Sequence, residues 1–494
     1  MVTVLGFLTI GVILTLLLTR RVSAVVALAG VPVVTAFIAG FSPAEVGGFV
    51  SDGLAGVVGV TAMFVFAIVY FGVMRDAGLF DPVIRKLVAL AGNAPTTVCL
   101  ATTALATAAH LDGAGATTFL ITIPAMLPLF DRLGMSRLTL TVCVGMGAGV
   151  MNLLPWGGPT ARAATTVGVD ANELWVPLIP AQIAGILLAL GIAWFLGRRE
   201  SRRPEVREAV RAVLEDGERA RAADPAATGP GAGAPPTAGR AGPDADGTGS
   251  AADPGGAGPD TGDDRTAVGT DAGTAGGGTV TATEPDLRRP RLLWVNAALT
   301  AATVGVLISG AVPLEMVFLV ASIIALVVNY PGLEQQTERI NAQARGAMLM
   351  ASTLLAAGAF LGILEGSGMI EGMGVAVASA IPTTLGTAMP LVVGILGVPL
   401  SLLFGPDAYY FGVLPVLTGV GAEFGVAPVD LARASIVGQE TVGFPISPLT
   451  GSFYLLVGLA GVDIGRHIRA LFGWVWLISL VMLAVAILTG AITL

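Results

Sequence analysis

The stretch Ala106-Thr-Ala-Ala-His-Leu-Asp-Gly-Ala-Gly-Ala-Thr-Thr-Phe119 (ATAAHLDGAGATTF) lies inside a long apolar run, yet it holds a histidine and a carboxylate two residues apart. An unpaired ionised carboxylate is very costly in hydrocarbon, so Asp112 must be neutralised, paired or placed in a wet cavity. Residues 95–130 are too long for one span, and two arms of about 14 residues would each reach only ~21 Å of a ~30 Å core. The segment is therefore predicted to be a re-entrant hairpin that turns at Gly113 and Gly115.

The composition of the chain is that of an integral membrane protein. Hydrophobic residues make up 54% of the 494 residues and only 12% are charged, and the mean hydropathy is +0.82, which is too apolar for a soluble protein of this length. The apolar segments approach ~20 residues and lack the alternation of barrel strands, so the spans are predicted to be helical. Residues 4–19 are interpreted as a retained span, because Arg20 and Arg21 follow that run instead of preceding it.

One long segment does not belong to the membrane. Residues 198–291 hold many of the charged residues and contain the run PAATGPGAGAPPTAGRAGPDADGTGSAADPGGAGPDTGDD, which has almost no large apolar side chains. Such a composition cannot bury enough surface to offset the entropy of ordering, so we expect a disordered linker. Residues 204–222, rich in Glu, Arg and Ala, favour a short helix at its start.

Basic residues at the ends of the spans predict their orientation, because Lys and Arg concentrate on the cytoplasmic side. Arg20 and Arg21, and then Arg75, Arg85 and Lys86, place two ends inside, with residues 79–91 as an interfacial helix. The basic cluster 198–203 and the arginines at 288–291 make the linker cytoplasmic. Both termini are then predicted outside, in a multi-pass protein of the cell membrane.

The second half repeats the pattern of the first with opposite orientation. Residues 382–420 form a second hairpin around the polar tip LFGPDAYYFG (403–412). Spans 138–168 and 431–459 are interrupted by NLLPWGGPT (152–160) and GQETVGFPISPLTG (438–451), and PWGGPT (155–160) can be laid on PISPLT (445–450). The sequence therefore predicts an all-α polytopic protein of two inverted-topology repeats, 1–197 and 292–494, each with three spans, a re-entrant hairpin, a broken span and a final span.

Irregular backbone at membrane depth persists only where protein or water satisfies it, so the two tips and two breaks are expected to meet around one cavity. The residues predicted to contact a substrate there are Thr117, Thr118, Asn152, Gly157, Gly158, Thr160, Arg162, Tyr409, Thr441, Ser447 and Thr450. The predicted proton-coupling residues are His110, Asp112, Asp407 and Glu440, and the three carboxylates are also the candidates to meet a metal ion.

Each of these residues also has a structural interpretation. Serines and threonines in membrane helices often bond their own backbone. Tyr409 and Tyr410 could anchor a shallow tip at the interface, and the three carboxylates could form ion pairs with Arg162 or Arg433. His467, beside two arginines, is most simply an interfacial residue.

The balance of charge points to the kind of cargo. Up to three carboxylates face Arg162 as the one deeply placed cation, and a free polyanion would be repelled there. A polycarboxylate carrying a hard divalent cation would fit better, because such cations take carboxylate, carbonyl and hydroxyl oxygens. The sequence holds no metal motif of defined spacing, so no resident cofactor is expected.

Four segments resemble the citrate-metal:proton symporter family, CitMHS, within a superfamily of ion transporters: HLDGAGATTFLITIPAMLPL (110–129), MNLLPWGGPTARAA (151–164), LFGPDAYYFGVLPVL (403–417) and GQETVGFPISPLTGSFYLLVG (438–458). The resemblance covers both membrane halves. It implies proton-driven import of citrate complexed to a divalent metal such as Mg²⁺ or Ca²⁺. It also implies a homodimer of scaffold and elevator-type transport domains, with no nucleic acid among its partners.

The chain departs from related sodium-coupled transporters at both tips. Those proteins carry Ser-Asn-Thr signatures, where this chain has His110-Leu-Asp112 and Pro406-Asp407-Ala, which favours protons or a metal-bearing substrate over sodium. A proton symporter of another organic acid, of the gluconate or dicarboxylate type, and an ion antiporter remain the alternatives. The chain lacks HExxH, GxSxG and paired GxGD motifs, which argues against an intramembrane hydrolase, and inverted halves with midplane breaks favour alternating access over a channel.

Overall fold

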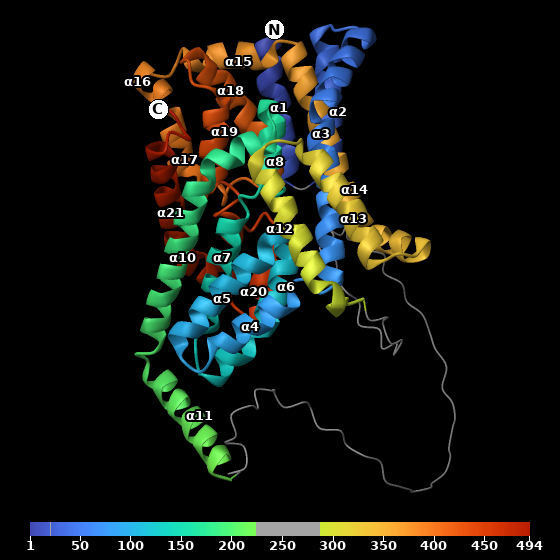
Figure 1. Cartoon of the computed structure of the whole chain (residues 1–494). Helices are drawn as coiled ribbons and strands as arrows, with labels where there is room; N and C mark the ends of the chain where they lie inside the picture. Colours follow the sequence, from blue (N-terminus) through green and yellow to red (C-terminus); the bar gives the residue numbers. More distant parts are fainter. Residues whose placement is uncertain (20, 224–286) are drawn as a thin grey trace, which may run out of the picture. The chain divides into compact units, whose positions relative to one another are not determined.

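The computed structural model describes residues 1–19, 21–223 and 287–494, which form helices and connecting turns without a strand among them. Two compact units separate, Met1–Val210 with Thr283–Leu494, and Arg211–Ala282. The disorder predicted for the linker falls mostly on residues 224–286 and so lies outside the described residues. The helix predicted at its start is present as α11 (Pro204–Ala223) (Figure 1).

The first half of the chain consists of helices that follow the predicted order. Its elements are α1 (Val2–Leu18), α2 (Ala24–Ala39), α3 (Pro43–Asp76), α4 (Asp81–Ala91), α5 (Pro95–Ala109), η1 (His110–Asp112), α6 (Gly115–Arg132), α7 (Arg137–Met151), α8 (Gly158–Val167), α9 (Ala171–Trp175), η2 (Val176–Leu178), α10 (Ile179–Glu200) and α11. The hairpin is α5, η1 and α6, with Gly113 in the left-handed region at a φ of +73°. The predicted break separates α7 from α8.

The second half has a similar series of helices. Its elements are η4 (Pro290–Leu292), α12 (Leu293–Ser309), α13 (Leu314–Asn329), α14 (Leu333–Gly366), α15 (Met369–Ala378), α16 (Thr383–Thr387), α17 (Met389–Leu400), the π-helical turn η5 (Ala408–Val413), α18 (Leu414–Glu423), α19 (Pro428–Gly438), η6 (Phe444–Ile446), α20 (Gly451–Ala460) and α21 (Ile464–Leu488). The second predicted break separates α19 from α20. The third helix of each half, α3 or α14, has 34 residues.

The two long helices pack against each other through glycines. A Cβ placed on Gly53 of α3 would lie 2.1 Å from the Gly358 carbonyl oxygen, and one on Gly362 of α14 would lie 2.1 Å from that of Phe49. Only glycine permits this approach of two backbones. Helices α2 and α13 pack beside this pair, and we call α2, α3, α13 and α14 the helix pack.

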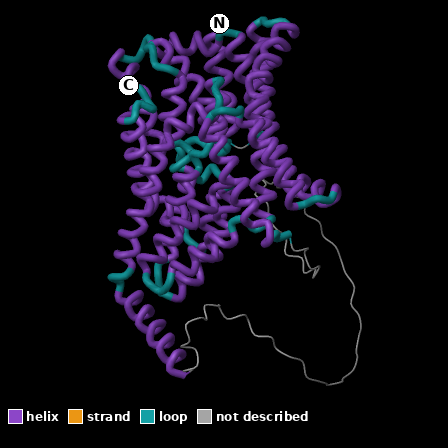
Figure 2. The backbone as a smooth tube through the Cα atoms, in the orientation of Figure 1, coloured by secondary structure: helices purple, strands orange, loops and turns teal. Residues whose placement is uncertain are grey.

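The hairpins, the broken helices and the helices packed on them form a second group, the hairpin bundle, defined as α5–α8, α10 and α17–α21 with η1 and η5. Within it, α5 packs on α7 and α10, and α17 packs on α19 and α21. Figure 2 shows irregular segments at the centre of this bundle, between helices that continue above and below them. These segments are the two breaks, so the polar backbone lies in the interior as predicted.

Five helical segments of the described chain are long and apolar enough to cross a membrane by length and composition: Pro43–Asp76, Ala171–Glu200, Pro290–Ser309, Leu333–Gly366 and Ile464–Leu488. With the overall composition, they make this a helical membrane protein. The spans predicted at 54–74 and 347–364 are much longer in the structure, because α3 and α14 each begin with a polar stretch. Ser42 and Glu45 form a capping box at the start of α3.

Candidate functional site

A cavity of about 200 Å³ lies where both hairpins and both breaks meet. We name its four surroundings tip 1 (residues 110–115), break 1 (152–157), tip 2 (401–407) and break 2 (439–450). The predicted residues that line the cavity are His110, Asn152, Gly158, Arg162, Glu440 and Thr450. The lining residues that were not predicted as substrate contacts are Gly113, Gly115, Pro159, Pro406, Phe444 and Ser452. The predicted meeting of tips and breaks around one cavity is confirmed.

One side of the cavity is cationic. Arg162 lies in the first turns of α8, and its Nε donates to Asp407 Oδ1 of tip 2 at 2.6 Å, with the two side chains 11% and 29% exposed. Gly158 begins the same helix, and a Cβ there would lie 2.7 Å from Arg162 Nη1. The glycine thus leaves room for the guanidinium beside the cavity. This is one of the ion pairs considered from the sequence, and it joins tip 2 to α8.

The other side of the cavity carries Glu440. Both of its carboxylate oxygens are buried without a hydrogen-bond partner in the described residues. The Ser447 hydroxyl is a neighbour of this carboxylate, and the charges of Arg162 and Asp407 act on it. Its φ of 52° is the only positive value outside glycine in the described chain, a costly conformation for this residue. A buried carboxylate in this condition needs a proton or a cation.

A chain of side chains links tip 1 to the backbone of Glu440. His110 Nδ1 lies 2.7 Å from Thr118 Oγ1, and its Nε2 lies 3.2 Å from Asn152 Oδ1. Asn152 Nδ2 donates in turn to the Glu440 carbonyl oxygen at 2.8 Å. Because the amide oxygen only accepts, Nε2 of His110 carries the hydrogen. The buried ring also stacks on Phe444, with centroids 5.4 Å apart.

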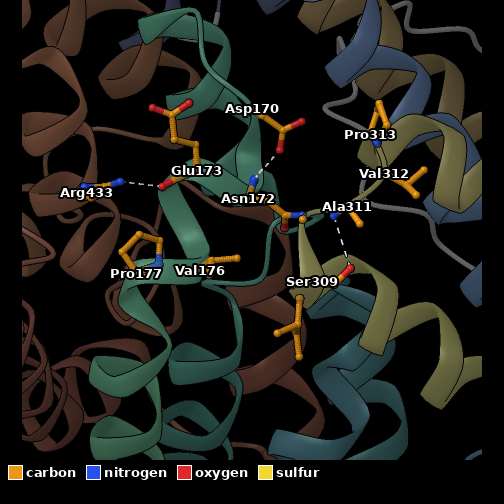
Figure 3. A pocket seen from close by; sticks show the side chains of 12 residues that line it. Asp170, Asn172, Glu173, Val176, Pro177, Ser309, Ala311, Val312, Pro313 and Arg433 are labelled. Atoms are coloured by element: carbon orange, nitrogen blue, oxygen red, sulfur yellow. Dashed lines mark hydrogen bonds between the residues drawn. The ribbon is translucent and has the colours of Figure 1, made fainter.

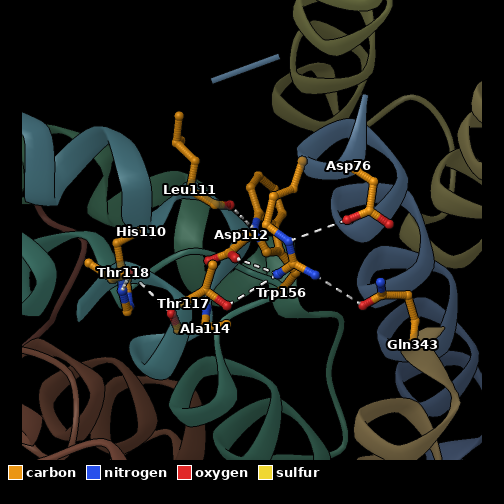
Figure 4. Close-up of polar contacts among 10 residues, drawn as sticks. Asp76, His110, Leu111, Asp112, Ala114, Thr117, Thr118, Trp156 and Gln343 are labelled. Atoms are coloured by element: carbon orange, nitrogen blue, oxygen red, sulfur yellow. Dashed lines mark hydrogen bonds and ion pairs between the residues drawn. The ribbon is translucent and has the colours of Figure 1, made fainter. Parts of the chain in front are cut away.

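Asp112 does not line this cavity. Its Oδ1 accepts from the Ala114 amide at 2.9 Å, and its Oδ2 lies 3.8 Å from Nη1 of Arg75 on α3. The same Arg75 nitrogen donates to Thr117 Oγ1 at 3.2 Å. Figure 4 shows Asp112 and Thr117 close together at the tip of the first hairpin. The partner of Asp112 is therefore neither Arg162 nor Arg433, the two considered from the sequence.

Several other predicted residues make structural bonds around the cavity. Tyr409 bonds Ser435, and Tyr410 donates to the Gln439 carbonyl; both rings are fully buried, so an anchoring role at the interface is wrong. The hydroxyls of three residues donate to backbone carbonyls, as the structural interpretation of such residues expects: Thr160 to Leu153, Thr441 to Ile436 and Thr450 to Ser447. Thr118 Oγ1 lies 3.0 Å from the Ala114 carbonyl oxygen as well as beside His110 Nδ1. Ser447 Oγ accepts from the Leu449 amide within break 2.

One placement corrects the sequence interpretation further. His467 is fully buried, with Nε2 donating to the Pro445 carbonyl at 2.9 Å and Nδ1 2.9 Å from Thr141 Oγ1, so it is not an interfacial residue. Gly157 caps α8, where a Cβ would lie 2.6 Å from the Asn152 carbonyl oxygen. The turn therefore needs a glycine at this position.

A second cavity, of about 560 Å³, lies between α9 and the α12–α13 connection (Figure 3). Arg433 lines it and donates to the carbonyl oxygens of Glu173 and Ala491. Asp170 and Glu173 contribute carboxylates to the same wall. Within the described chain, the residues predicted as substrate, proton or metal contacts do not line this cavity.

The arrangement defines a class of protein. Two halves that each contribute a hairpin and a broken helix to one buried polar cavity, in a helical membrane protein, are the architecture of a secondary transporter. A crystal structure of the YdaH transporter from Alcanivorax borkumensis has the same general fold, with a TM-score of 0.52, 15% identity, and coverage of 90% of this chain and 86% of that one.

The particular family follows from the sequence comparisons. The family model CitMHS, citrate transporter, matches residues 4–438. A "Mg(2+)/citrate complex secondary transporter" of Bacillus subtilis (strain 168) is 37% identical over 100% of this chain and 99% of its own length. A "Citrate transporter" of the same organism is 36% identical, with all of both chains covered. This chain belongs to the CitMHS citrate transporter family, and it is a secondary transporter, not an enzyme.

Proposed function

We propose that this chain imports citrate as a complex with a divalent metal ion, such as Mg²⁺ or Ca²⁺, together with protons. The names of the two relatives support the cargo. The observation that carries the proposal is the presence of opposite charges in the lining of one cavity. Arg162 on α8 supplies the cation, and Glu440 on break 2, whose carboxylate oxygens have no hydrogen-bond partner in the described residues, supplies the anion. A metal-citrate complex offers carboxylates to the first and shares its positive ion with nearby oxygens.

Coupling to protons follows from the net charge of the cargo. Citrate keeps a net negative charge after binding one divalent ion, so an ionised Glu440 repels the complex. A proton on Glu440 removes that repulsion, and by linkage the proton and the complex then favour each other's binding. Glu440 is therefore the proposed coupling group, and the loaded, neutralised site crosses the membrane at a lower electrostatic cost than a half-loaded one.

Asp407 is proposed to exchange partners on binding. A citrate carboxylate can take the place of Asp407 on the Arg162 guanidinium, because both are planar oxygen pairs that fit the same fork. Asp407, released at tip 2, is then available to the metal ion. Asn152, Gly157, Gly158, Thr160, Ser447 and Thr450 supply backbone and hydroxyl contacts from the two breaks in this proposal.

The structural proposal is an inverted repeat that moves as an elevator. Its support is the matched series of helices and two identical tripeptides, Gly168-Val-Asp170 and Gly461-Val-Asp463. Each glycine ends a broken helix in the left-handed conformation, and each aspartate caps the next helix. In this scheme the helix pack belongs to a static, dimeric scaffold, and the hairpin bundle moves. Cross-linking across a scaffold interface should trap a homodimer without stopping transport.

The topological proposal keeps the three segments 1–197, 198–291 and 292–494, with both termini outside the cell membrane and the linker in the cytoplasm. Thiol labelling of single cysteines placed at the termini and in the linker, from each side of intact cells, tests it. Labelling of the linker from outside would contradict this orientation.

The test of function is uptake of labelled citrate by proteoliposomes containing the purified chain. We expect uptake to require a divalent ion from a panel, to stop with EDTA and to accelerate under an inward proton gradient. Competition by gluconate and by dicarboxylates measures selectivity among organic acids. Citrate uptake that persists without any divalent ion and ignores the proton gradient would refute the proposal.

A further inference from the structure

Arg75, at the end of α3, joins the two helix groups of the molecule. Its Nη1 meets Asp112 and Thr117 in the first hairpin, while its Nη2 lies 3.5 Å from Gln343 Oε1 on α14. Figure 4 shows Asp112 and Thr117 on one side of these contacts and Asp76 and Gln343 on the other. Arg75 therefore contacts the hairpin bundle with one nitrogen and the helix pack with another.

The helix pack holds this arginine in place. Gly72 lies one turn before Arg75, and a Cβ on Gly72 would lie 2.3 Å from Gln343 Cδ, so the glycine lets the amide lie across α3. Asp76 lies 3.8 Å from Arg75 Nε and accepts from the buried Arg339 at 3.2 Å. The guanidinium is thus oriented from α3 and α14 before it meets the hairpin.

Arg75 holds two residues that are next to the cavity lining in the sequence. Asp112 and Thr117 flank Gly113 and Gly115, which line the candidate site. The turn is fixed from its other side by Trp156, whose Nε1 donates to the Leu111 carbonyl at 2.8 Å. Loss of the Arg75 contacts would leave tip 1 attached to its own bundle but released from the helix pack.

We propose that Arg75 is a positioning residue that latches tip 1 to the helix pack in this conformation and must release Asp112 and Thr117 when the bundle moves. The inference rests on the proposed elevator transport. Asp112 then acts as the other half of the latch, not as a ligand of the metal ion. The latch sets the balance between the two orientations of the site, because contacts made in only one state stabilise that state.

The test measures that balance directly. Ser452 lines the cavity beside Gly115, and the native Cys99 and Cys143 are both buried, so Ser452→Cys provides a reporter thiol. Its rate of modification by an impermeant maleimide is measured from each face of oriented proteoliposomes, with and without Mg²⁺ and citrate. Variants are Arg75→Gln, Arg75→Lys, Asp112→Asn and Thr117→Val. Arg85→Gln, on an exposed arginine of α4, is the matched control.

Arg75→Gln should change the ratio of the two labelling rates by about threefold to tenfold, as expected for partly exposed charge-assisted bonds. Asp112→Asn should shift it in the same direction, Arg75→Lys and Thr117→Val less, and Arg85→Gln not at all. For uptake, Arg75→Gln should change the maximal rate more than the KM for the complex. The double exchange Arg75→Asp with Asp112→Arg should restore part of the parental ratio.

An unchanged ratio in folded Arg75→Gln and Asp112→Asn proteins would overturn the latch. If Arg75→Gln does not fold, Thr117→Val and Asp112→Asn decide alone, since each weakens one of the two contacts that Arg75 makes with the hairpin. Labelling needs no transported substrate, so a parental chain that fails to move citrate but still shows the latch shift would count against the proposed cargo only.

Discussion

The two breaks share one framework, but the charges beside them are opposite, with Arg162 on α8 after break 1 and Glu440 within break 2. An amide residue follows the last residue of the preceding helix in each: Asn152 after α7 and Gln439 after α19. Asn152 reaches His110 on tip 1, and Gln439 reaches Ser401 and the Phe404 carbonyl on tip 2. Past these amides the likeness ends, because α8 brings a cation to the cavity and break 2 brings a carboxylate.

This difference separates the residues that fix the geometry of the site from the residues that bind the substrate. The amides use their donors and acceptors on neighbouring backbone and side chains, so they fix the geometry of each break. Arg162 and Glu440 have no such equivalents in the opposite break, and their charges face the same small volume. Recognition of an anionic complex with a positive ion at its centre therefore depends on the asymmetry of the two halves.

The strongest test removes the acidic side of this asymmetry. Glu440→Gln keeps the size and the left-handed backbone position but cannot ionise, so we expect a loss of proton-driven uptake of about 100-fold. Binding of the metal-citrate complex, measured at equilibrium without a gradient, should lose its dependence on pH. Glu423→Gln, on an exposed residue at the end of α18, is the control. Parental pH dependence in Glu440→Gln would assign coupling elsewhere.

The cationic side is tested next. Arg162→Gln should weaken binding of the complex by about 30-fold, since a charge-assisted bond to a carboxylate contributes ~1.5–3 kcal/mol. Arg162→Lys should recover only part, because an ammonium cannot form the two-pronged contact. In a double-mutant cycle with Asp407→Asn, the proposed exchange predicts that the two effects are not additive. Additive losses would mean that Asp407 and the substrate do not compete for Arg162.

A smaller effect is expected from the space that Gly158 leaves. Gly158→Ala places a Cβ 2.7 Å from Arg162 Nη1, and the flexible guanidinium must shift, which should raise the KM for the complex about fivefold. Gly451 begins α20 as Gly158 begins α8, but nothing lies within 4 Å of a Cβ there. Gly451→Ala should leave uptake unchanged. Equal effects of the two substitutions would remove the distinction between the breaks.

Much of this architecture was accessible from the sequence. Long apolar runs interrupted by glycine and proline predicted both hairpins and both breaks, because only helices satisfy their own backbone in lipid and interruptions stand out against them. The starts of α3 and α14 were missed since hydropathy registers only their apolar parts. The Ser42-Pro-Ala-Glu45 pattern was a usable signal for the first of them.

The partners within the site could not be predicted in the same way. Asp112 pairs with Arg75, a residue that counted in the sequence only as a basic span end, because nothing local indicates which helix passes beside tip 1. Likewise, burial decides the role of Tyr409 and His467, and burial depends on neighbours far along the chain. Sequence patterns predicted the elements, while pairings between distant segments required the fold.

The smallest effect is expected from His467, which supports break 2 from outside the cavity. His467 donates to the Pro445 carbonyl from the buried face of α21 but does not line the cavity. His467→Gln should lower the free energy of unfolding by about 1–3 kcal/mol through the unpaired carbonyl, with less than about a twofold change in KM. Thr141→Val removes only the contact on the other side of the ring and should cost less. Thermal unfolding of the purified variants, alongside uptake, measures both quantities. A large rise in KM from His467→Gln would mean that the charge of Glu440 depends on support from outside its own break, and the separation of framework from recognition would fail.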